Sequence, residues 1–417
     1  MTEKKKILVF SDHPFSPSGV GTQTKYFIEA LLKTGRYQFI CFGGALKHQD
    51  NRAVKTEEWG EDLVIYPIEG YGDASLLREA IWDERPDGVW IMTDPRFWGW
   101  LWEMEEEVRS HCPLVYYHVW DNYPYPSYNK KLYESNDAIA SISKLTADIV
   151  STVAPNTKHR HIPHAIPPIF KVESEEVIKK FRKDNFGDDE NKFIIFWNNR
   201  NARRKQSGSL IYWFKKFLDK VGHDKAVLLM HTDTRDQHGQ NLDLIVSDLG
   251  LVNGEVKFSR QKLPPDALSM LYNAADVTVN ISDAEGFGLA TLESLSCGTP
   301  IIVNMTGGLQ EQVTDGKKWF GIGIEPASKA IIGSQEIPWI REDRLNEDDV
   351  VNALVTMCEK TSKQRRKLGL LGRKHIEKNY AYEEFEKAWV EFMDEVIEEN
   401  GSWDTRKNYK SWEQIQL

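Results

Sequence analysis

The sequence predicts an α/β protein made of two doubly wound domains in tandem. Short apolar runs, each with the length of a buried strand, alternate with helical patterns in both halves of the chain. The alternation stops once, at a proline-rich stretch, and then restarts. Strands that alternate with helices form parallel sheets with helices on both faces. A chain of 417 residues is also too long for one small core.

The first half of the chain predicts an N-terminal Rossmann-like domain over residues 1–168. The first strand is expected at 7–11, and a helix follows over 21–35, with its apolar side chains on one face and Gly35 at its end. Further strands are expected at 38–44, 63–68, 87–92, 113–120 and 137–143.

The break between the domains is expected at HIPHAIPPIFKV, residues 161–172, because proline disfavours both helix and central strand. After the break, a second domain is predicted over residues 169–379. It begins with a charged helix at 174–185, and another helix, at 264–275, lies between its strands. Those strands are expected at 193–199, 225–231, 256–259, 276–282 and 301–304. The rest, 380–417, is predicted as a helical segment that returns to the first domain, with an amphipathic helix at 382–399.

Composition excludes several classes of protein. A net charge of −10 disfavours nonspecific binding of nucleic acid. The four cysteines are scattered without a CxxC pair, which favours reduced thiols in a cytoplasmic protein over a zinc site or a disulfide framework. No apolar run reaches the roughly 20 residues of a membrane span, so stable membrane insertion is not expected.

The stretch EGFGLATLESLSCGTP, residues 285–300, places two carboxylates around a glycine turn. It follows the strand at 276–282 and opens a helix that runs to about Ser296. Gly286 and Gly288 let the backbone approach a ligand closely, and the free N–H groups of a helix start favour phosphate. A carboxylate repels phosphate, so Glu285 and Glu293 are expected to accept hydrogen bonds from sugar hydroxyls such as a ribose diol. The plainer alternative is a helix-cap acid and a solvated acid.

This stretch resembles the E-x7-E signature of the retaining glycosyltransferases of family four, and CGTPIIVN and GGLQE match the pattern of that family as well. The resemblance is clearest over 190–315. It implies the GT-B fold, two Rossmann-like domains facing a central cleft, with a nucleotide-diphosphate sugar bound by the C-terminal domain. It also implies that Glu285 contacts the donor sugar and Glu293 the ribose. The resemblance further implies that the backbone N–H groups of Phe287, Gly288 and Leu289 face the donor sugar and its diphosphate.

The stretch FWNNRNARRKQ, residues 196–206, follows a strand and is rich in cations. Arg200 and Lys205 match the arginine and lysine that hold the donor diphosphate in that family. Fixed cations stabilise the negative charge of a departing diphosphate. No DxD pair follows a strand, so neither a metal ion nor another cofactor is expected. Arg203 and Arg204 are expected to be solvated or to contact an acceptor.

Other candidate residues lie on loops of the N-terminal domain. Gly19 and Gly21 belong to a long loop after the first strand, which the family places near the donor phosphates. His118 ends a strand where the family often carries a histidine near the reactive carbon of the donor sugar; the alternative is a buried structural histidine. Asp121 and Tyr123 are expected to line the acceptor site.

The predicted nucleobase contact is Arg260, which follows the strand at 256–259. One departure from the family concerns the neighbouring strand end. The family commonly has a glycine-rich turn there, whereas this chain has His231, Thr232 and Asp233. Donor contacts near that turn are therefore not carried over.

The sequence thus predicts a metal-independent, retaining hexosyl- or pentosyltransferase that uses a nucleotide-diphosphate sugar. The acceptor is a glycan, a lipid-linked sugar, a protein or a hydroxylated base in DNA. A noncatalytic nucleotide-sugar-binding protein, a nucleotide-sugar epimerase, a phosphorylase and a nicotinamide dehydrogenase are the alternatives.

Overall fold

The computed structural model describes residues 3–45, 52–335 and 337–410, and it contains two compact units. The first unit combines residues 1–164 with 383–417, and the second comprises residues 165–382. These limits lie within a few residues of the boundaries at 168 and 380 that the proline-rich stretch and the final helix indicated. The chain therefore returns to its first unit after completing the second.

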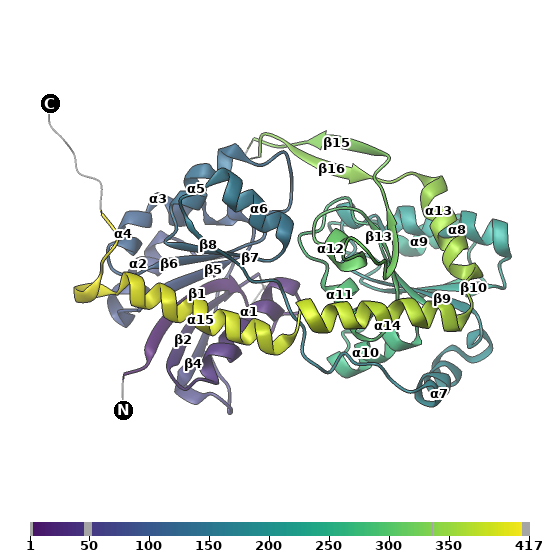
Figure 1. Ribbon diagram of the computed structural model, residues 1–417, viewed down its shortest axis with the longest axis horizontal. Coiled ribbons are helices and arrows are strands. Elements are labelled where there is room, and N and C mark those ends of the chain that lie inside the picture. Colours follow the sequence, from purple (N-terminus) through teal and green to yellow (C-terminus); the bar gives the residue numbers. More distant parts are fainter. Residues whose placement is uncertain (1–2, 46–51, 336, 411–417) are drawn as a thin grey trace. The chain divides into compact units, whose positions relative to one another are not determined.

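The first unit is built on one eight-stranded sheet, in the order β3-β4-β2-β1-β5-β6-β7-β8 (Figure 1). All neighbouring strands are parallel except β3 and β4. The strands are β1 (Lys5–Asp12), β2 (Tyr37–Gly44), β3 (Val54–Lys55), β4 (Leu63–Pro67), β5 (Gly88–Met92), β6 (Leu114–His118), β7 (Ala138–Ser141) and β8 (Lys158–His161). The six predicted strands are confirmed, whereas β3 and β8 have no apolar run and were missed.

Helices cover this sheet, and the last long helix of the chain is one of them. The helices are α1 (Gly19–Leu32), α2 (Ala74–Glu84), α3 (Gly99–Glu103), α4 (Glu105–Arg109), α5 (Lys130–Glu134), α6 (Lys144–Val153) and α15 (Tyr382–Asn400). Phe27 of α1 stacks on Trp90 of β5, with 4.3 Å between ring centroids. Trp389 of α15 packs edge-on against Phe27, at 4.8 Å. Helices α1 and α15 therefore share one core with the sheet.

The second unit has a six-stranded parallel sheet in the order β11-β10-β9-β12-β13-β14. Its strands are β9 (Phe193–Asn198), β10 (Ala226–His231), β11 (Val256–Ser259), β12 (Val277–Asn280), β13 (Ile301–Asn304) and β14 (Gly321–Ile324). The five predicted strands are confirmed, and only β14, with the sequence GIGI, was missed.

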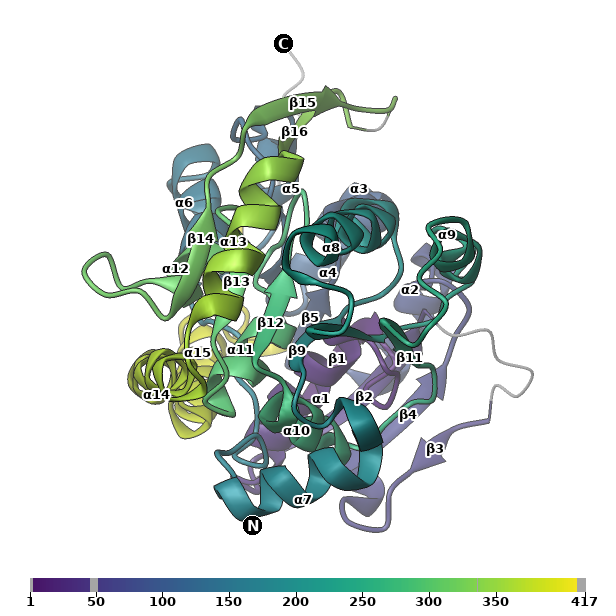
Figure 2. The ribbon, with the colours of Figure 1, turned by 90° about the vertical axis from the view of Figure 1, so that its right-hand side faces the viewer.

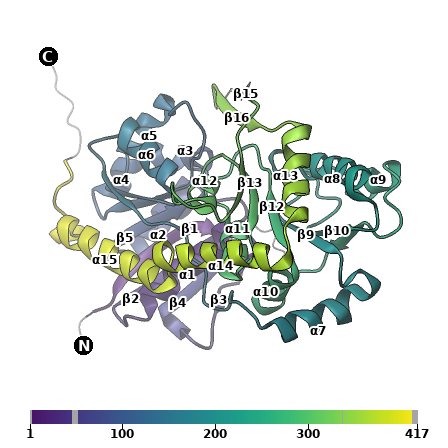
Figure 3. The ribbon, with the colours of Figure 1, turned by 45° about the vertical axis from the view of Figure 1, so that its right-hand side comes forward.

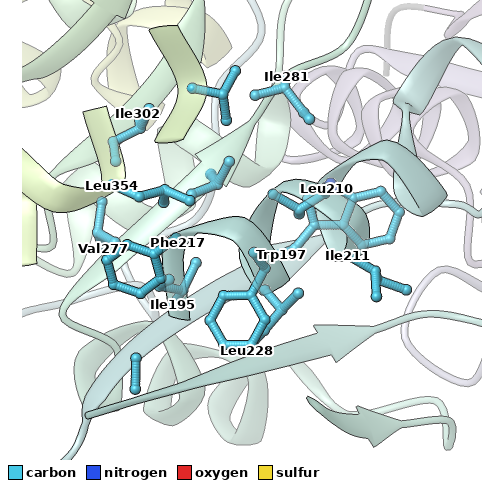
Figure 4. Packing of buried hydrophobic residues seen from close by; sticks show 14 of the residues in the cluster. Ile195, Trp197, Leu210, Ile211, Phe217, Leu228, Val277, Ile281, Ile302 and Leu354 are labelled. Atoms are coloured by element: carbon cyan, nitrogen blue, oxygen red, sulfur yellow. The ribbon is translucent and has the colours of Figure 1, made fainter. Parts of the chain in front are cut away.

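Helices lie on both faces of this second sheet, as a doubly wound fold requires (Figure 2). They are α7 (Glu175–Phe186), α8 (Ser207–Val221), α9 (Leu242–Asp248), α10 (Pro265–Ala274), α11 (Leu289–Ser296), α12 (Leu309–Val313), α13 (Glu347–Glu359) and α14 (Ser362–Asn379). Figure 4 shows the core between the sheet and helices α8 and α13, where Ile195 and Trp197 of β9 meet Leu210 and Phe217 of α8. The alternate residues of β9 face the other side, where Phe196 packs on Tyr272 of α10.

A two-stranded antiparallel hairpin follows the sheet of the second unit and was not predicted. It consists of β15 (Ser328–Ile332) and β16 (Ile340–Arg344), and it leads into α13 (Figure 3). Its strands pair with each other and with no strand of the six-stranded sheet, among the residues that the structure describes.

Two expectations from composition concern cysteines and membrane spans. Each of the four cysteines, all within the described residues, is a free thiol; Cys41, Cys112 and Cys297 are buried and Cys358 is partly exposed. None of the helices formed by residues 3–45, 52–335 and 337–410 has the length and apolar character needed to cross a membrane.

Candidate active site

Two loops of the second unit carry most of the residues of the predicted donor site. The loop at 199–206 follows strand β9, and the loop at 281–288 follows strand β12. These strands are parallel neighbours, so both loops leave the sheet at its carboxyl edge. Ligands of doubly wound sheets bind at this edge.

Lys205 and Glu285 meet across the two loops. The Lys205 ammonium donates to Oε2 of Glu285, and the two side chains are only 9% and 12% exposed. Asn280 donates to the same oxygen at 3.3 Å. Burial alone would raise the pKa of Glu285, but the charges of Lys205 and Arg204, together with these hydrogen bonds, outweigh it and lower the pKa to about 2. Glu285 is therefore an anion at neutral pH, beside a buried cation.

Helix α11 begins four residues after Glu285, without a side-chain cap. Its N-cap residue Gly288 has a φ of 93°, in the left-handed region that favours glycine. The first N–H groups of an α-helix have no partner within the helix. The start of α11 therefore presents hydrogen-bond donors at the same edge as Lys205, and the predicted turn from strand to helix is confirmed.

The GGLQE stretch, residues 307–311, packs against this turn. Gly308 donates its N–H to the carbonyl oxygen of Glu285 at 3.0 Å. A Cβ atom at Gly308 would lie 2.6 Å from the Cα of Phe287, so a larger residue does not fit. Gln312 donates to the carbonyl of Phe287 at 2.8 Å. These contacts fix the backbone on which Glu285 and the start of α11 are placed.

Glu293 lies one turn into α11 and accepts a hydrogen bond from the Tyr272 hydroxyl at 2.6 Å. That hydroxyl accepts from Nδ2 of Asn198, at the end of β9, at 2.8 Å. Burial raises the pKa of Glu293 to about 7, and the Tyr272 hydrogen bond offsets only part of this rise. Glu293 thus exchanges its proton near neutral pH. Tyr272 was missed because it shares the apolar pattern of α10.

Arg200 lies on the same edge and forms a two-point ion pair with Asp236. Its Nε donates to Oδ2 at 2.6 Å and its NH2 to Oδ1 at 3.1 Å. The Arg200 side chain is 60% exposed, so a ligand can reach it. Asp236 belongs to the loop after β10. Asn201, in the loop after β9, donates to the carbonyl of Gln240 in that loop at 2.7 Å, so the two loops are joined. Asp236 carried no sequence signal of its own.

Arg203 and Arg204 are exposed, as their predicted solvation requires, and each also has a partner within the second unit. Arg203 donates to both carboxylate oxygens of Glu342, at 2.9 and 2.5 Å. Arg204 donates to the carbonyl oxygen of Ala284. Both partners, a buried carboxylate and a loop carbonyl, are distant in sequence and need donors, so these contacts could not be predicted.

Arg260 follows the edge strand β11, and His231 is the last residue of the neighbouring strand β10. Arg260 is more than half exposed and pairs with Asp243 at 2.5 Å. Nδ1 of His231 lies 2.9 Å from the Ser259 hydroxyl. Both residues lie at the carboxyl edge, and the contact of Arg260 with a nucleobase stays a prediction.

The glycine loop of the first unit leads into α1. Gly21 donates its N–H to the hydroxyl of Ser18, the N-cap residue, at 2.9 Å. A Cβ atom at Gly21 would lie 2.3 Å from Oγ of Ser16, so the packing of this loop already requires glycine. Gly19 is exposed at the first position of the helix. The role of either glycine toward a donor stays a prediction.

His118 ends strand β6 and is fully buried. Its Nε2 lies 2.8 Å from the Tyr133 hydroxyl, and burial lowers its pKa to about 3, so the ring is neutral at physiological pH. Asp121 and Tyr123 follow β6 and are partly buried. The predicted roles of these three residues at the donor sugar and the acceptor stay predictions.

The carboxyl edge of the second unit thus carries two cations, Arg200 and Lys205, and the start of helix α11, which are kinds of groups that bind phosphate in proteins. Carboxylates flank them. No group of three or more His, Cys, Asp or Glu side chains is arranged to hold a metal ion in the part of the chain that the structure describes.

Comparison with known proteins finds similarity to glycosyltransferases. Residues 177–347 match the sequence model of the family described as glycosyl transferases group 1. A D-inositol 3-phosphate glycosyltransferase of Acidothermus cellulolyticus is 36% identical over 112 residues, which are 26% of this chain and 25% of that protein. An uncharacterized glycosyltransferase of Methanocaldococcus jannaschii is 32% identical over 190 residues, or 43% of this chain and 45% of that protein. The matched stretches thus span less than half of these curated relatives.

Solved structures match nearly the whole chain. A sucrose-phosphate synthase from Thermosynechococcus elongatus superposes with a TM-score of 0.74, at 17% identity, over 95% of this chain and all of that one. The HepE protein of Anabaena, in complex with UDP-glucose, superposes with a TM-score of 0.70, at 16% identity, over 94% of this chain and 99% of that one. At such identities the likeness shows the fold, which is GT-B.

Proposed function

We propose that this chain, whose residues 177–347 belong to the group 1 glycosyl transferases, transfers a sugar from a nucleotide-diphosphate sugar to a hydroxyl acceptor, with retention of anomeric configuration. The observation that carries the proposal is the meeting of Lys205, Glu285 and the start of helix α11 at the carboxyl edge of one parallel sheet. A cation and the N–H groups of a helix start suit a pyrophosphate, and an anion beside them suits hydroxyls.

In this proposal Lys205, Arg200 and the first N–H groups of α11 bind the donor pyrophosphate. Departure of the nucleoside diphosphate builds negative charge, which fixed cations and helix dipoles stabilise. Each cation already pairs with a carboxylate, Lys205 with Glu285 and Arg200 with Asp236, so each is held in place before a donor binds. We assign no metal ion to this step, because these groups supply the positive potential.

The two carboxylates of the signature hold hydroxyls in this proposal. Glu285, an anion at neutral pH, accepts from the transferred sugar, and Glu293 accepts from the ribose. Because the pKa of Glu293 is about 7, the fraction of Glu293 that is ionised and accepts this hydrogen bond changes with pH near neutrality. The acceptor hydroxyl attacks the anomeric carbon on the face from which the phosphate departs, and the phosphate takes the proton of that hydroxyl. The product then keeps the anomeric configuration without a covalent enzyme intermediate.

The names of related proteins indicate where to begin with substrates. HepE was solved with UDP-glucose, so UDP-sugars are the first donors to test. The D-inositol 3-phosphate glycosyltransferases suggest small polyol phosphates as one acceptor class, beside glycans, lipid-linked sugars, proteins and hydroxylated DNA bases. The net charge of −10 argues against DNA among these acceptors.

The test combines donor binding with turnover. Wild-type protein is heated with UDP-, GDP- and ADP-sugars, and the preferred donor is expected to raise Tm by several degrees, because a ligand at one hundred times its Kd stabilises by about 2.7 kcal/mol. That donor is then incubated with the acceptor classes while free nucleoside diphosphate is measured. Nuclear magnetic resonance of the product is expected to show the anomeric configuration of the donor.

Variants separate this proposal from its alternatives. Lys205→Ala and Glu293→Ala are expected to lower transfer at least 100-fold, whereas Asp219→Asn, at an exposed pair on α8, leaves it unchanged. A donor-induced rise in Tm without turnover on any acceptor identifies a noncatalytic binding protein. A new sugar nucleotide formed without release of free nucleoside diphosphate identifies an epimerase. Unchanged transfer in both site variants contradicts the assignment of the site.

A further inference from the structure

The hairpin of β15 and β16 carries a buried acid toward the loops of the candidate site. Its second strand has the sequence IREDR, in which the Glu342 side chain is only 2% exposed. A buried carboxylate destabilises a fold unless donors compensate its charge. The fold therefore needs hydrogen-bond donors around the carboxylate of Glu342.

Those partners come from the loop that carries Lys205 and from the hairpin itself. Arg203 donates hydrogen bonds to both carboxylate oxygens of Glu342, at 2.9 and 2.5 Å. Arg344 donates to Oε2 of Glu342 at 2.6 Å. Strand β16 and one site loop are thus joined through a single carboxylate.

Arg344 also contacts the loop that carries Glu285. Arg344 lies 3.0 Å from Oδ2 of Asp283, which is also 2% exposed, and Gln206 donates to that oxygen at 2.6 Å. Burial raises the pKa of Asp283 to about 6, against the effect of these two donors. The carboxylate of Asp283 therefore depends on Arg344 and Gln206 to keep its charge at neutral pH.

Backbone hydrogen bonds complete the connection. Asp283 donates its N–H to the carbonyl of Arg204 at 2.8 Å, and Asp343 donates to the carbonyl of Asp283 at 2.9 Å. Asn304 donates to the carbonyl of Asp343 at 2.9 Å. Arg203 is two residues from Lys205, and Asp283 is two residues from Glu285. These contacts connect the hairpin to both loops that carry the central ion pair.

We propose that Glu342 and Arg344 are positioning residues, which hold the two site loops so that Lys205 and Glu285 meet in the geometry that sugar transfer requires. The contacts described above link them to Arg203 and Asp283, and neither was singled out in the sequence. The catalytic consequence rests on the proposed function, whereas the hold on the loops does not. Removing residues that orient catalytic groups typically costs 10- to 100-fold in activity.

The first experiment measures the hold on the loops without any donor. Hydrogen–deuterium exchange is followed in wild type and in Glu342→Gln, at the amides of Lys205, Gln206 and Asp283, which bond to neighbouring carbonyls. We expect exchange at least tenfold faster at all three amides in the variant. Asp219→Asn is the matched control, because it neutralises a carboxylate of the same unit whose partners are exposed. Unchanged exchange at both loops overturns the proposal, whatever the activity.

The second experiment measures turnover with the preferred donor. In Glu342→Gln we expect kcat to fall roughly 10- to 100-fold while the KM for the donor changes less than about threefold, because misplacement weakens the transition state more than the ground state. The double variant Arg203→Met with Glu342→Gln is expected to be no slower than the single one, because both changes break the same contact.

A few outcomes separate the possibilities. If Glu342→Gln does not fold, Arg344→Gln takes its place, because Arg344 is about one third exposed and contacts both Glu342 and Asp283. A purely structural role predicts a lower Tm with kcat unchanged per folded molecule, and that result overturns the proposal. Wild-type protein without turnover on any donor defeats the proposed function, while hydrogen exchange still decides the positioning of the loops.

Discussion

At the scale of single residues, folding favours the neutral acid form of Glu293, whereas the proposed donor contact needs its anion. Its folded-state pKa of about 7 lies above its ordinary value of 4.5, so the folded protein binds more protons than the unfolded chain between these values. This contribution to the free energy of unfolding is present below pH 4.5 and is lost as the pH rises through 7. Keeping an anion here therefore costs stability at the pH at which the proposed donor binds.

Glu293→Gln is expected to stabilise the unliganded protein and to weaken the donor. At pH 8 the free energy of unfolding rises by about 1–3 kcal/mol, and at pH 4 the difference from wild type is much smaller. Donor affinity falls roughly 10- to 100-fold at pH 8, because a hydrogen bond to a charged acceptor is lost. Denaturant unfolding and calorimetric titration measure both. A variant less stable than wild type at pH 8 would contradict the raised pKa.

Lys205 and Glu285 depend on each other in the same way as other buried ion pairs. The depressed pKa of Glu285, about 2 against an ordinary 4.5, gives stability above pH 4.5 that is lost as the pH falls toward 2. We expect Lys205→Met to cost about 3 kcal/mol at pH 7, because it leaves a buried anion without its main cation. The difference from wild type should shrink below pH 4.5.

The matched control for this pair is Lys205→Met combined with Glu285→Leu. Replacing both partners with apolar residues leaves no unpaired buried charge, so this double variant is expected to recover most of the lost stability. It should nevertheless show no transfer, since both proposed contacts are gone. Stability that stays as low as in Lys205→Met alone would show that packing, and not charge, explains the loss.

At the scale of elements, the turn into α11 depends on the glycines of the next loop. Gly308→Ala is expected to lower the free energy of unfolding by about 3 kcal/mol or more and to abolish donor binding, because a Cβ atom would lie 2.6 Å from the Cα of Phe287. Gly99→Ala, where nothing lies within 4 Å of the added atom, is the control and should stay within about 0.5 kcal/mol of wild type. Chemical denaturation and donor titration provide the measurements. Donor binding that survives in Gly308→Ala would separate the site from this turn.

Sequence reasoning succeeded for elements with local signals and failed for those without. The strands with apolar runs in both sheets, all but β3, β8 and β14, and the turn before α11 were predicted from apolar runs and glycines. Strand β15 was missed because its sequence, SKAII, is mostly exposed and has no buried run. The pair of Lys205 with Glu285 spans 80 residues of sequence and that of Arg203 with Glu342 spans 139. Such partners are set by the register of the folded loops and leave no local pattern.

At the scale of the whole molecule, the chain completes its first unit only with its last helix. Trp389 of α15 is fully buried and packs against Phe27 of α1 and Tyr117 of β6, each at 4.8 Å between ring centroids. Asp394, further along the helix, accepts from Tyr37 at 2.6 Å. The first unit is therefore continuous in space but discontinuous in sequence.

Trp389→Ala is expected to lower the free energy of unfolding by about 3–5 kcal/mol, the usual cost of emptying a site that held a large aromatic ring. Trp82→Ala, at a tryptophan that is 58% exposed, is the matched control and should cost about 1 kcal/mol or less. Denaturant unfolding followed by circular dichroism compares the two. Equal costs would mean that α15 adds little to the first unit.

The central claim is that a donor pyrophosphate lies between Lys205, Arg200 and the start of helix α11. A crystal structure with the bound nucleoside diphosphate of the preferred donor tests it most directly. The account predicts phosphate oxygens at hydrogen-bond distance, about 3 Å, from Nζ of Lys205, from the Arg200 guanidinium and from a backbone nitrogen at 287–289. A pyrophosphate bound elsewhere, with Lys205 still paired to Glu285 and no phosphate near α11, would contradict it.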